Sequence, residues 1–246
     1  MQQRYNYVIL GIILLILSIV FYYIHYVIFQ DSHHLLIFLI GDIAFVPIEV
    51  LMVSLVIHHL LTEMEKKKKM EKMNMVIGTF FSEVGTKLLT IISDADPKLD
   101  TIRKEFIVDN NWNDAEFKSV IKSMKNYDYM IDIEKIDLQE LAGFMVSKRD
   151  FLLRLLENPN LLEHETFTEL LRAVFHMTEE FTCRNELSCL PNTDMKHLEG
   201  DINRVYAQIT LEWFYYMRYL KNNYPYLFSL AMRTNPFDTN ASPIIS

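Results

Sequence analysis

Glycine is scarce in this sequence, and its six copies stand far apart, at positions 11, 41, 78, 85, 143 and 200. Phosphate-binding loops need clustered glycines, because several backbone N–H groups must approach the ligand closely. The chain therefore has neither a Gly-rich phosphate loop nor a dinucleotide fingerprint. It also lacks the motifs G-x-S-x-G, H-E-x-x-H and C-x-x-C. These absences disfavour a nucleotide-driven enzyme and a standard hydrolase, and we assign no catalytic residue and no cofactor.

Cysteine is equally rare, since Cys183 and Cys189 are the only two. Two cysteines are too few for a disulfide framework, and we expect both to be free thiols. Together with His176 and His197 they offer four zinc ligands. Their spacing is irregular and lacks the short C-x2-C knuckle of structural zinc sites, so we assign no metal ligand here.

Charged residues are almost missing from the first quarter of the chain, where residues 5–61 contain only Asp31, Asp42 and Glu49. Two apolar runs, about 5–29 and 35–61, are each long enough as helices to cross about 30 Å of hydrocarbon. The five-residue polar break between them permits only an antiparallel hairpin. The alternative for the first run is a cleaved signal peptide, but the run is too long and no small-x-small site follows it.

The charges that flank the hairpin predict its orientation. The polar break has no Lys or Arg, whereas the second run is followed by the basic cluster Lys66, Lys67, Lys68 and Lys69. The positive-inside rule then puts both termini in the cytoplasm, with the protein in the cell membrane. The lysines also suit anionic lipid headgroups, which makes the bilayer the first expected partner.

Two acids interrupt the second apolar run. Asp42 and Glu49 are seven residues apart, which puts them on nearly the same helix face, with Pro47 between them. A charged side chain at membrane depth costs about 2.5 to 3.5 kcal/mol on insertion scales, so each acid needs protein or water around it. One reading is a ring of carboxylates that lines a cation or proton path in a homo-oligomer. The other is a structural role, in which the acids bond to nearby polar groups and hold the hairpin or oligomer together.

Residues 63–92 read as a basic juxtamembrane and connecting helix, because nothing in them except two glycines weakens a helix. Apolar residues recur there at the spacing of a short coiled-coil seam. The seam packs either against the rest of the domain or against a second copy of the chain. Its members, with the two glycines of an adjoining face, are Met70, Met73, Ile77, Gly78, Phe80, Val84 and Gly85.

The remainder of the chain reads as an acidic cytoplasmic helical domain over 93–234, followed by an extended tail over 235–246. The stretch after Met73 has 18 basic against 26 acidic residues, which accounts for the whole net charge of −8 and disfavours nucleic acid as a partner. Prolines and N-cap patterns at Asn113 and Asp137 delimit the helices. We expect helices near 97–107, 113–125, 137–157, 160–182, 194–223 and 225–233, and a weak strand at 127–133.

The expected helix over 160–182 carries a set of polar residues that resembles a metal site. They form one stripe opposite an apolar face, so a solvated amphipathic helix accounts for them. Carboxylate-bridged metal sites favour Glu-x-x-His on two helices, and no Glu-x-x-His occurs in this sequence. The residues in question are Glu165, Glu169, His176 and Glu180.

Three segments resemble those of an uncharacterised family of prokaryotic two-pass membrane proteins with a cytoplasmic helical domain. They are GDIAFVPIE at 41–49, MVIGTFFSEVGT at 75–86 and YPYLFSL at 224–230. The resemblance implies a plasma-membrane location and transfers no function to any residue.

These observations predict an all-α protein, with a transmembrane hairpin over 1–62 followed by a multi-helix domain. Our leading hypothesis is a non-enzymatic, homo-oligomeric membrane protein whose cytoplasmic domain senses a state or binds a protein partner. A second hypothesis is a small cation or proton channel with Asp42 and Glu49 in its path. A third is a metal-dependent enzyme that uses the acidic and histidine stripe.

Overall fold

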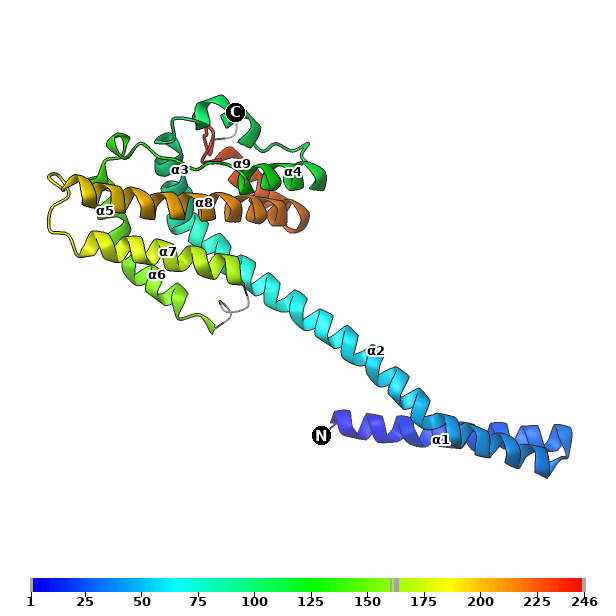
Figure 1. The fold of residues 1–246 in the computed structure, drawn as a ribbon. Helices are drawn as coiled ribbons and strands as arrows, with labels where there is room; N and C mark the ends of the chain where they lie inside the picture. The colour runs from blue at the N-terminus through cyan, green and yellow to red at the C-terminus, as the bar shows by residue number, and fades with distance from the viewer. Residues whose placement is uncertain (1, 160, 162–163, 245–246) are drawn as a thin grey trace. The chain divides into compact units, whose positions relative to one another are not determined.

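The computed structural model describes residues 2–159, 161 and 164–244, and over these residues the chain is helical without a β-strand (Figure 1). It divides into two compact units, Met1–Lys66 and Lys67–Ser246. The all-α class expected from the sequence is confirmed for the described residues.

The first unit is a helical hairpin with a very short connection. Gln30 has a φ of 49°, and this left-handed residue ends the first helix. The Asp31 carboxylate then accepts the backbone N–H groups of His33 and His34, both at 3.0 Å, and caps the second helix. The connection is therefore shorter than the expected five residues. The helices are α1 (Gln2–Phe29) and α2 (Ser32–Phe80).

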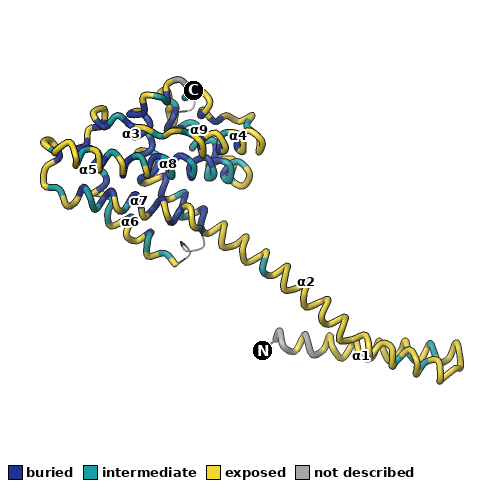
Figure 2. The backbone as a smooth tube through the Cα atoms, viewed as in Figure 1, coloured by how far each residue is buried: buried dark blue, intermediate teal, exposed yellow. Residues whose placement is uncertain are grey.

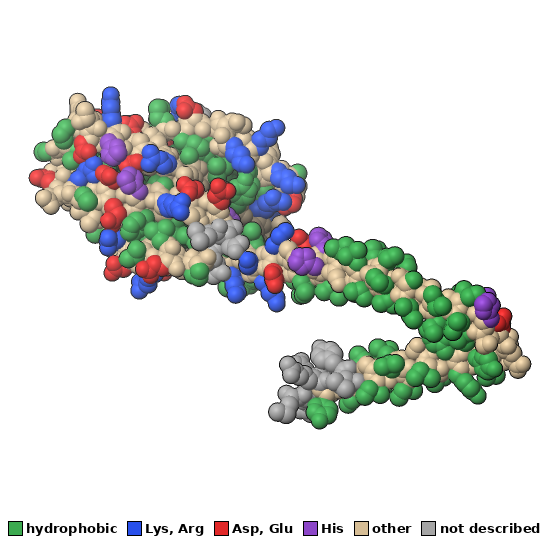
Figure 3. Space-filling view, turned by 60° about the horizontal axis from the view of Figure 1, so that its bottom comes forward, with side chains coloured by type: hydrophobic (Ala, Val, Ile, Leu, Met, Phe, Trp, Pro, Cys, Tyr) green, Lys and Arg blue, Asp and Glu red, His purple; other side chains and the backbone are tan. Residues whose placement is uncertain are grey.

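Both helices of the hairpin are long and apolar enough to cross a membrane. Their most apolar windows have mean hydropathies of 2.5 and 2.3, and none of either window is buried within the protein. Over its described residues, the hairpin is mostly exposed in Figure 2, and many hydrophobic side chains lie on its surface in Figure 3. A helix from the core of a soluble protein would be mostly buried instead.

The end of α2 belongs to the second unit and enters its core. Buried residues recur there from Met73 through Ile77 and Phe80 to Ile92. Five α-helical turns advance about 18 residues, one fewer than the step from Met73 to Ile92. A π-helical turn, η1 (Phe81–Gly85), absorbs the extra residue before α3 (Thr86–Asp94) continues the helix.

In the second unit α8 contacts α3, α4, α7 and α9, and α5 and α6 pack on the neighbouring α7. Helix α7 runs antiparallel to α8 (Figure 1). Proline stands immediately before α8 and at the first position of α9, as expected for helix starts. The helices are α4 (Asp114–Lys125), α5 (Leu138–Ser147), α6 (Arg149–Leu156), α7 (Glu165–Thr182), α8 (Asn192–Asn223) and α9 (Pro225–Arg233).

Three expectations about this unit need correction. The helix expected over 97–107 is two 3₁₀ turns, η2 (Leu99–Thr101) and η3 (Arg103–Phe106). No strand forms over 127–133, which leads into a third 3₁₀ turn, η4 (Ile133–Lys135).

The helix expected over 137–157 breaks at Lys148, where φ is −100° and ψ is 0°. The break lets α5 and α6 each pack on α7, which one straight helix could not do along the same length. The helix expected over 160–182 is described from Glu165, and residues 160 and 162–163 of that expectation lie outside the described residues.

The N-cap expectations hold to different degrees. At Asn113 the full capping box forms with Glu116. At Asp137 only half of it is present, since the side chain accepts the backbone N–H of Glu140 at 2.9 Å.

The tail over 235–246 is docked on the domain in its first part. Phe237 is fully buried and packs its ring on Phe106, Trp213 and Phe214. The Asn235 side chain holds the start of the tail against the domain by donating a 3.0 Å hydrogen bond to the Phe106 carbonyl. Residues 245 and 246 lie outside the described part of the chain.

Candidate metal centre and other candidate sites

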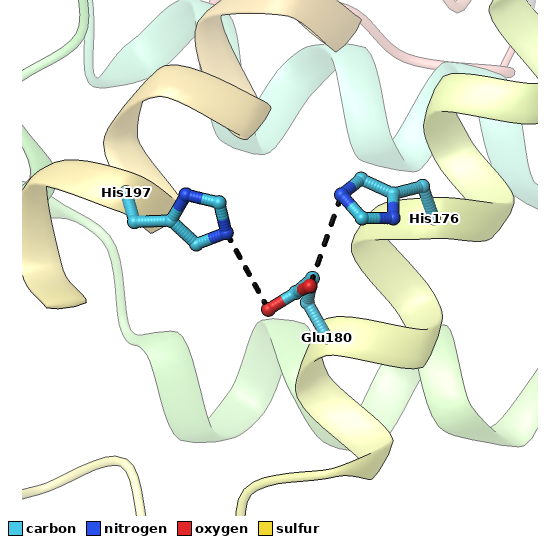
Figure 4. A group of neighbouring side chains, drawn as sticks. All are labelled: His176, Glu180 and His197. Carbon is cyan, nitrogen blue, oxygen red and sulfur yellow. Dashed lines mark ion pairs between the residues drawn. The ribbon is translucent and has the colours of Figure 1, made fainter.

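Two facing helices bring together a cluster of histidines and carboxylates. On α7, His176 and Glu180 are one turn apart, and on α8, His197 and Asp201 are one turn apart. Figure 4 shows His176, Glu180 and His197 pointing toward one another, and their ligand atoms lie within 4.8 Å of each other. Asp201 joins them from beside His197.

The distances within the cluster are uniform. His176 Nε2 lies 3.8 Å from Glu180 Oε1 and 3.5 Å from Asp201 Oδ2. His197 Nε2 lies 3.6 Å from Glu180 Oε2 and 3.5 Å from the same Asp201 Oδ2. A hydrogen bond between these atoms would be about 2.7 to 3.2 Å long. Each histidine therefore lies between Glu180 and Asp201, at distances longer than a hydrogen bond to either.

Burial and arginine contacts hold the two carboxylates in place. Asp201 is only 3% exposed, whereas the histidines are about half exposed. Arg204 donates to Asp201 Oδ1 at 2.9 Å and leaves Oδ2 without a hydrogen-bond partner. Arg184 donates to Glu180 Oε2 at 2.6 Å, and this hydrogen bond lowers the pKa of the Glu180 carboxyl. Glu180 is therefore ionised at neutral pH.

The cluster combines parts of both metal sets that the sequence suggested. His176 and Glu180 came from the polar stripe, and His197 came from the zinc-type set. The stripe's Glu169 pairs instead with Arg172 at 2.8 Å. Sequence reasoning missed Asp201, although the repeated spacing of His-x3-Glu on α7 and His-x3-Asp on α8 was visible. The exposed thiols Cys183 and Cys189 are not part of the cluster.

The hairpin acids have different surroundings. The Tyr22 hydroxyl of α1 donates a 2.9 Å hydrogen bond to Asp42 Oδ2, so Asp42 links the two helices of the hairpin. Pro47 lies inside α2. Glu49 is exposed, and it has no hydrogen bond or ion pair with any other described residue.

The lysine cluster is exposed on α2, where Lys66 pairs with Glu63 at 3.2 Å. The seam that follows lies largely in the core of its own unit, which is the intramolecular one of the two alternatives. Met70 remains 46% exposed, whereas Met73, Ile77, Phe80 and Val84 are buried.

The two glycines of the seam allow close packing. A Cβ on Gly78 would lie 2.6 Å from the Tyr216 hydroxyl oxygen of α8. A Cβ on Gly85 would lie 2.7 Å from the Phe81 ring and 2.8 Å from the Phe80 ring. Both positions therefore admit a neighbouring side chain only because glycine has none of its own.

A buried acid that the sequence did not single out lies on α8. The Glu212 side chain is 3% exposed and accepts a 3.1 Å hydrogen bond from the Thr166 hydroxyl. Burial raises the pKa of Glu212 to about 7. His164 Nε2 lies 3.9 Å away, and burial lowers the pKa of its imidazole, so the two groups do not form a full ion pair at neutral pH.

Comparison with known proteins shows which family the chain belongs to. The chain is 49% identical over 245 residues to the Uncharacterized protein MJ1433 of Methanocaldococcus jannaschii, covering 100% of this chain and 98% of that protein. The chain belongs to the MJ1433 family. Residues 2–61 match the family's N-terminal helical domain and residues 69–233 match its C-terminal helical domain.

The boundaries of the MJ1433 family domains agree with the structure. The unmatched residues 62–68 contain Lys66, Lys67 and Lys68 of the lysine cluster and enclose the division between the two compact units at Lys66 and Lys67. No solved structure matches the chain.

Proposed function

We propose that this MJ1433-family protein is a two-pass integral membrane protein whose C-terminal helical domain is a cytoplasmic sensing or interaction module. The observation that carries the proposal is the pair of apolar helices with no buried residue in their most apolar windows. Surface of this extent and apolarity is stable only when lipid or another protein covers it. A lipid bilayer matches both its length and its composition.

The orientation is supported by the charges next to α2. The connection between the helices has no Lys or Arg, whereas four consecutive lysines follow the second apolar run. The C-terminal domain would then lie in the cytoplasm, with both termini on that side of the cell membrane. The lysines would contact anionic headgroups.

Helix α2 suggests how such a module would communicate. The same helix carries the second apolar run and, further along, the buried Met73, Ile77 and Phe80. A change in the packing of the C-terminal domain around these residues would therefore move α2. Likewise, a movement of α2 would change the packing of the domain. A cytoplasmic protein partner or ligand would act by favouring one packing arrangement over another.

Self-association is supported by Glu49. An acid in the middle of a membrane helix needs a polar partner, and Glu49 has none among the described residues of its own chain. A second copy of α2 would bring another polar group to the same face. We therefore propose a homo-oligomer in the membrane.

A membrane-impermeant maleimide tests the topology, because the exposed thiols Cys183 and Cys189 are natural probes. In intact cells they should stay unlabelled, and lysis should make them reactive. As a matched control, Gln30→Cys in a Cys183→Ser, Cys189→Ser background should react in intact cells, since Gln30 lies in the hairpin connection. Labelling of the native cysteines in intact cells, or recovery of the protein in the soluble fraction, would refute the proposal.

The oligomeric state in mild detergent tests the second part, for which light scattering on the purified chain is sufficient. We expect more than one copy per particle. Glu49→Leu should keep the fold but weaken the assembly or change its size. A monomeric wild-type protein would contradict the self-association.

An ion channel is the second candidate, favoured by two carboxylates on one face of α2. The hydrogen bond from Tyr22 to Asp42 argues instead for a structural role of Asp42, because it uses the carboxylate within the hairpin. Flux through proteoliposomes decides between them. Wild-type flux that disappears in Asp42→Asn, Glu49→Gln would establish the channel, whereas absence of flux across cation and proton gradients supports the sensing module.

A further inference from the structure

The donor atoms of the cluster between α7 and α8 match the preferences of one class of ion. Ligand atoms of His176, Glu180 and His197 lie within 4.8 Å of one another there, and Asp201 Oδ2 lies 3.5 Å from both histidines. Imidazole suits the late first-row divalent ions, while Mg²⁺ and Ca²⁺ prefer oxygen ligands. Zn²⁺ accepts both kinds of donor and takes four ligands in a tetrahedron.

The spacing of these donors favours a tetrahedral site. The edge of a regular tetrahedron is about 1.63 times the distance from its centre to a corner, so ligands about 2.0 to 2.1 Å from Zn²⁺ lie about 3.3 to 3.4 Å apart. The distances from Asp201 Oδ2 to the two histidine nitrogens, both 3.5 Å, are close to this value, and Glu180 offers one oxygen to each histidine, at 3.8 and 3.6 Å.

Asp201 provides an independent reason to expect a cation. A buried carboxylate oxygen without a hydrogen bond is costly, yet Oδ2 of this 3% exposed side chain has no partner among the described residues. It points to the space that both histidines face. A metal ion at that place would satisfy the oxygen, whereas the two imidazoles at 3.5 Å make no hydrogen bond to it.

The two helices contribute matching halves to this arrangement. Each supplies a histidine and, one turn later, a carboxylate, and an arginine just beyond the end of α7 or within α8 holds each carboxylate. Arg184 binds Glu180, and Arg204 binds Asp201. Such contacts outside the ligand set orient a metal ligand before the metal arrives.

We infer that His176, Glu180, His197 and Asp201 form a tetrahedral Zn²⁺ site that joins α7 to α8. Four protein ligands fill the coordination of the ion and leave no open position for a substrate, as in structural and regulatory zinc sites. The inference goes beyond the proposed function by naming an ion that the sensing module would respond to. It does not depend on membrane insertion, because every ligand lies within the C-terminal unit.

The test uses the purified full-length chain in mild detergent, stripped of metal and then loaded with Zn²⁺. We expect about one Zn²⁺ per chain by elemental analysis after removal of excess metal. Co²⁺ in place of Zn²⁺ should give the intense visible absorption of a tetrahedral cobalt complex. These two readouts report stoichiometry and geometry separately from any activity.

Variants identify the ligands. His176→Gln and Asp201→Asn should each weaken Zn²⁺ binding by at least tenfold, the scale on which even outer contacts of metal sites act. Asp201→Asn keeps the shape of the side chain, and circular dichroism checks that both variants remain folded. Glu169→Gln, on α7 outside the cluster, and Cys183→Ser, Cys189→Ser are matched controls that should bind Zn²⁺ like the wild type.

Several outcomes would overturn the inference. A wild-type chain without stoichiometric Zn²⁺ is one, and an octahedral cobalt spectrum is another. Undiminished binding in a folded double variant, His176→Gln with Asp201→Asn, is a third. Loss of Zn²⁺ in the cysteine variant would assign the metal to the thiols instead. Because metal content and maleimide labelling are separate measurements, failure of this inference leaves the topology of the hairpin untouched.

Discussion

Replacing Glu212 with glutamine should change how the stability of the C-terminal domain depends on pH. The side chain is 3% exposed, and burial raises its pKa from 4.5 to about 7. Glutamine keeps the size of the side chain and an oxygen that can accept the Thr166 hydrogen bond. The substitution therefore removes the titration while it preserves the packing.

The magnitude follows from the difference in proton affinity between the folded and unfolded chain. A tenfold difference is worth about 1.4 kcal/mol, so raising the pKa from 4.5 to about 7 corresponds to about 3 kcal/mol. Below pH 4.5 both states hold the proton, and Glu212 contributes no pH dependence. Between 4.5 and 7 the unfolded chain releases it first, so the free energy of unfolding falls as the pH rises. Above pH 7 the penalty of about 3 kcal/mol is complete.

Glu212→Gln should thus be close to the wild type in stability at pH 4.5 and more stable by about 3 kcal/mol at pH 8. His164, the nearest titratable neighbour, has a pKa lowered by burial, which favours folding as the pH rises toward 6.5. That trend is present in both proteins. The difference between their stabilities largely cancels it.

Urea unfolding of the full chain in mild detergent, followed by circular dichroism, gives the free energies at each pH. Infrared difference spectra offer a second readout, since a protonated carboxyl that titrates near pH 7 should be present in the wild type and absent from the variant. A stability difference that stays constant from pH 4.5 to 8 would refute the reasoning. It would mean that Glu212 is solvated or paired in a way that its burial and contacts do not reveal.

Two further predictions concern packing, and urea unfolding of the same detergent-solubilised chain measures both. Gly85→Ala should destabilise the domain by about 1 to 3 kcal/mol, because the new Cβ meets two buried phenylalanine rings. The matched control Gly143→Ala, with nothing within 4 Å, should stabilise α5 by about 0.5 to 1 kcal/mol; equal effects would contradict the packing at Gly85. Phe237→Ala should cost about 3 to 5 kcal/mol by emptying a fully buried aromatic position, and an unchanged midpoint would show that the tail is not docked.

The helix boundaries show where local sequence is sufficient. The capping box at Asn113 and the proline that begins α9 depend on residues within one turn, so the sequence predicts them directly. The break at Lys148 has no such local signal. It follows from packing both α5 and α6 on α7, and the π turn at Phe81–Gly85 likewise follows from keeping one face buried over five turns.

The candidate metal site shows the same contrast between what local sequence predicts and what helix packing decides. Each half of it, His-x3-Glu and His-x3-Asp, is visible in the sequence, but each alone reads as part of a polar stripe. Glu212 was indistinguishable from a solvated acid for the same reason. Only the packing of α7 against α8 decides that Glu212 is buried and that both histidines lie within 4 Å of Glu180 and Asp201.

By itself, the sequence determined the all-α class and the two apolar helices. These are properties of composition and short-range periodicity, which a chain carries before it folds. The tertiary structure alone decided that the seam at Met73, Ile77 and Phe80 packs inside its own domain, and that Asp201 meets His176. Contacts between residues far apart in the chain depend on how whole helices pack, and no local pattern encodes that.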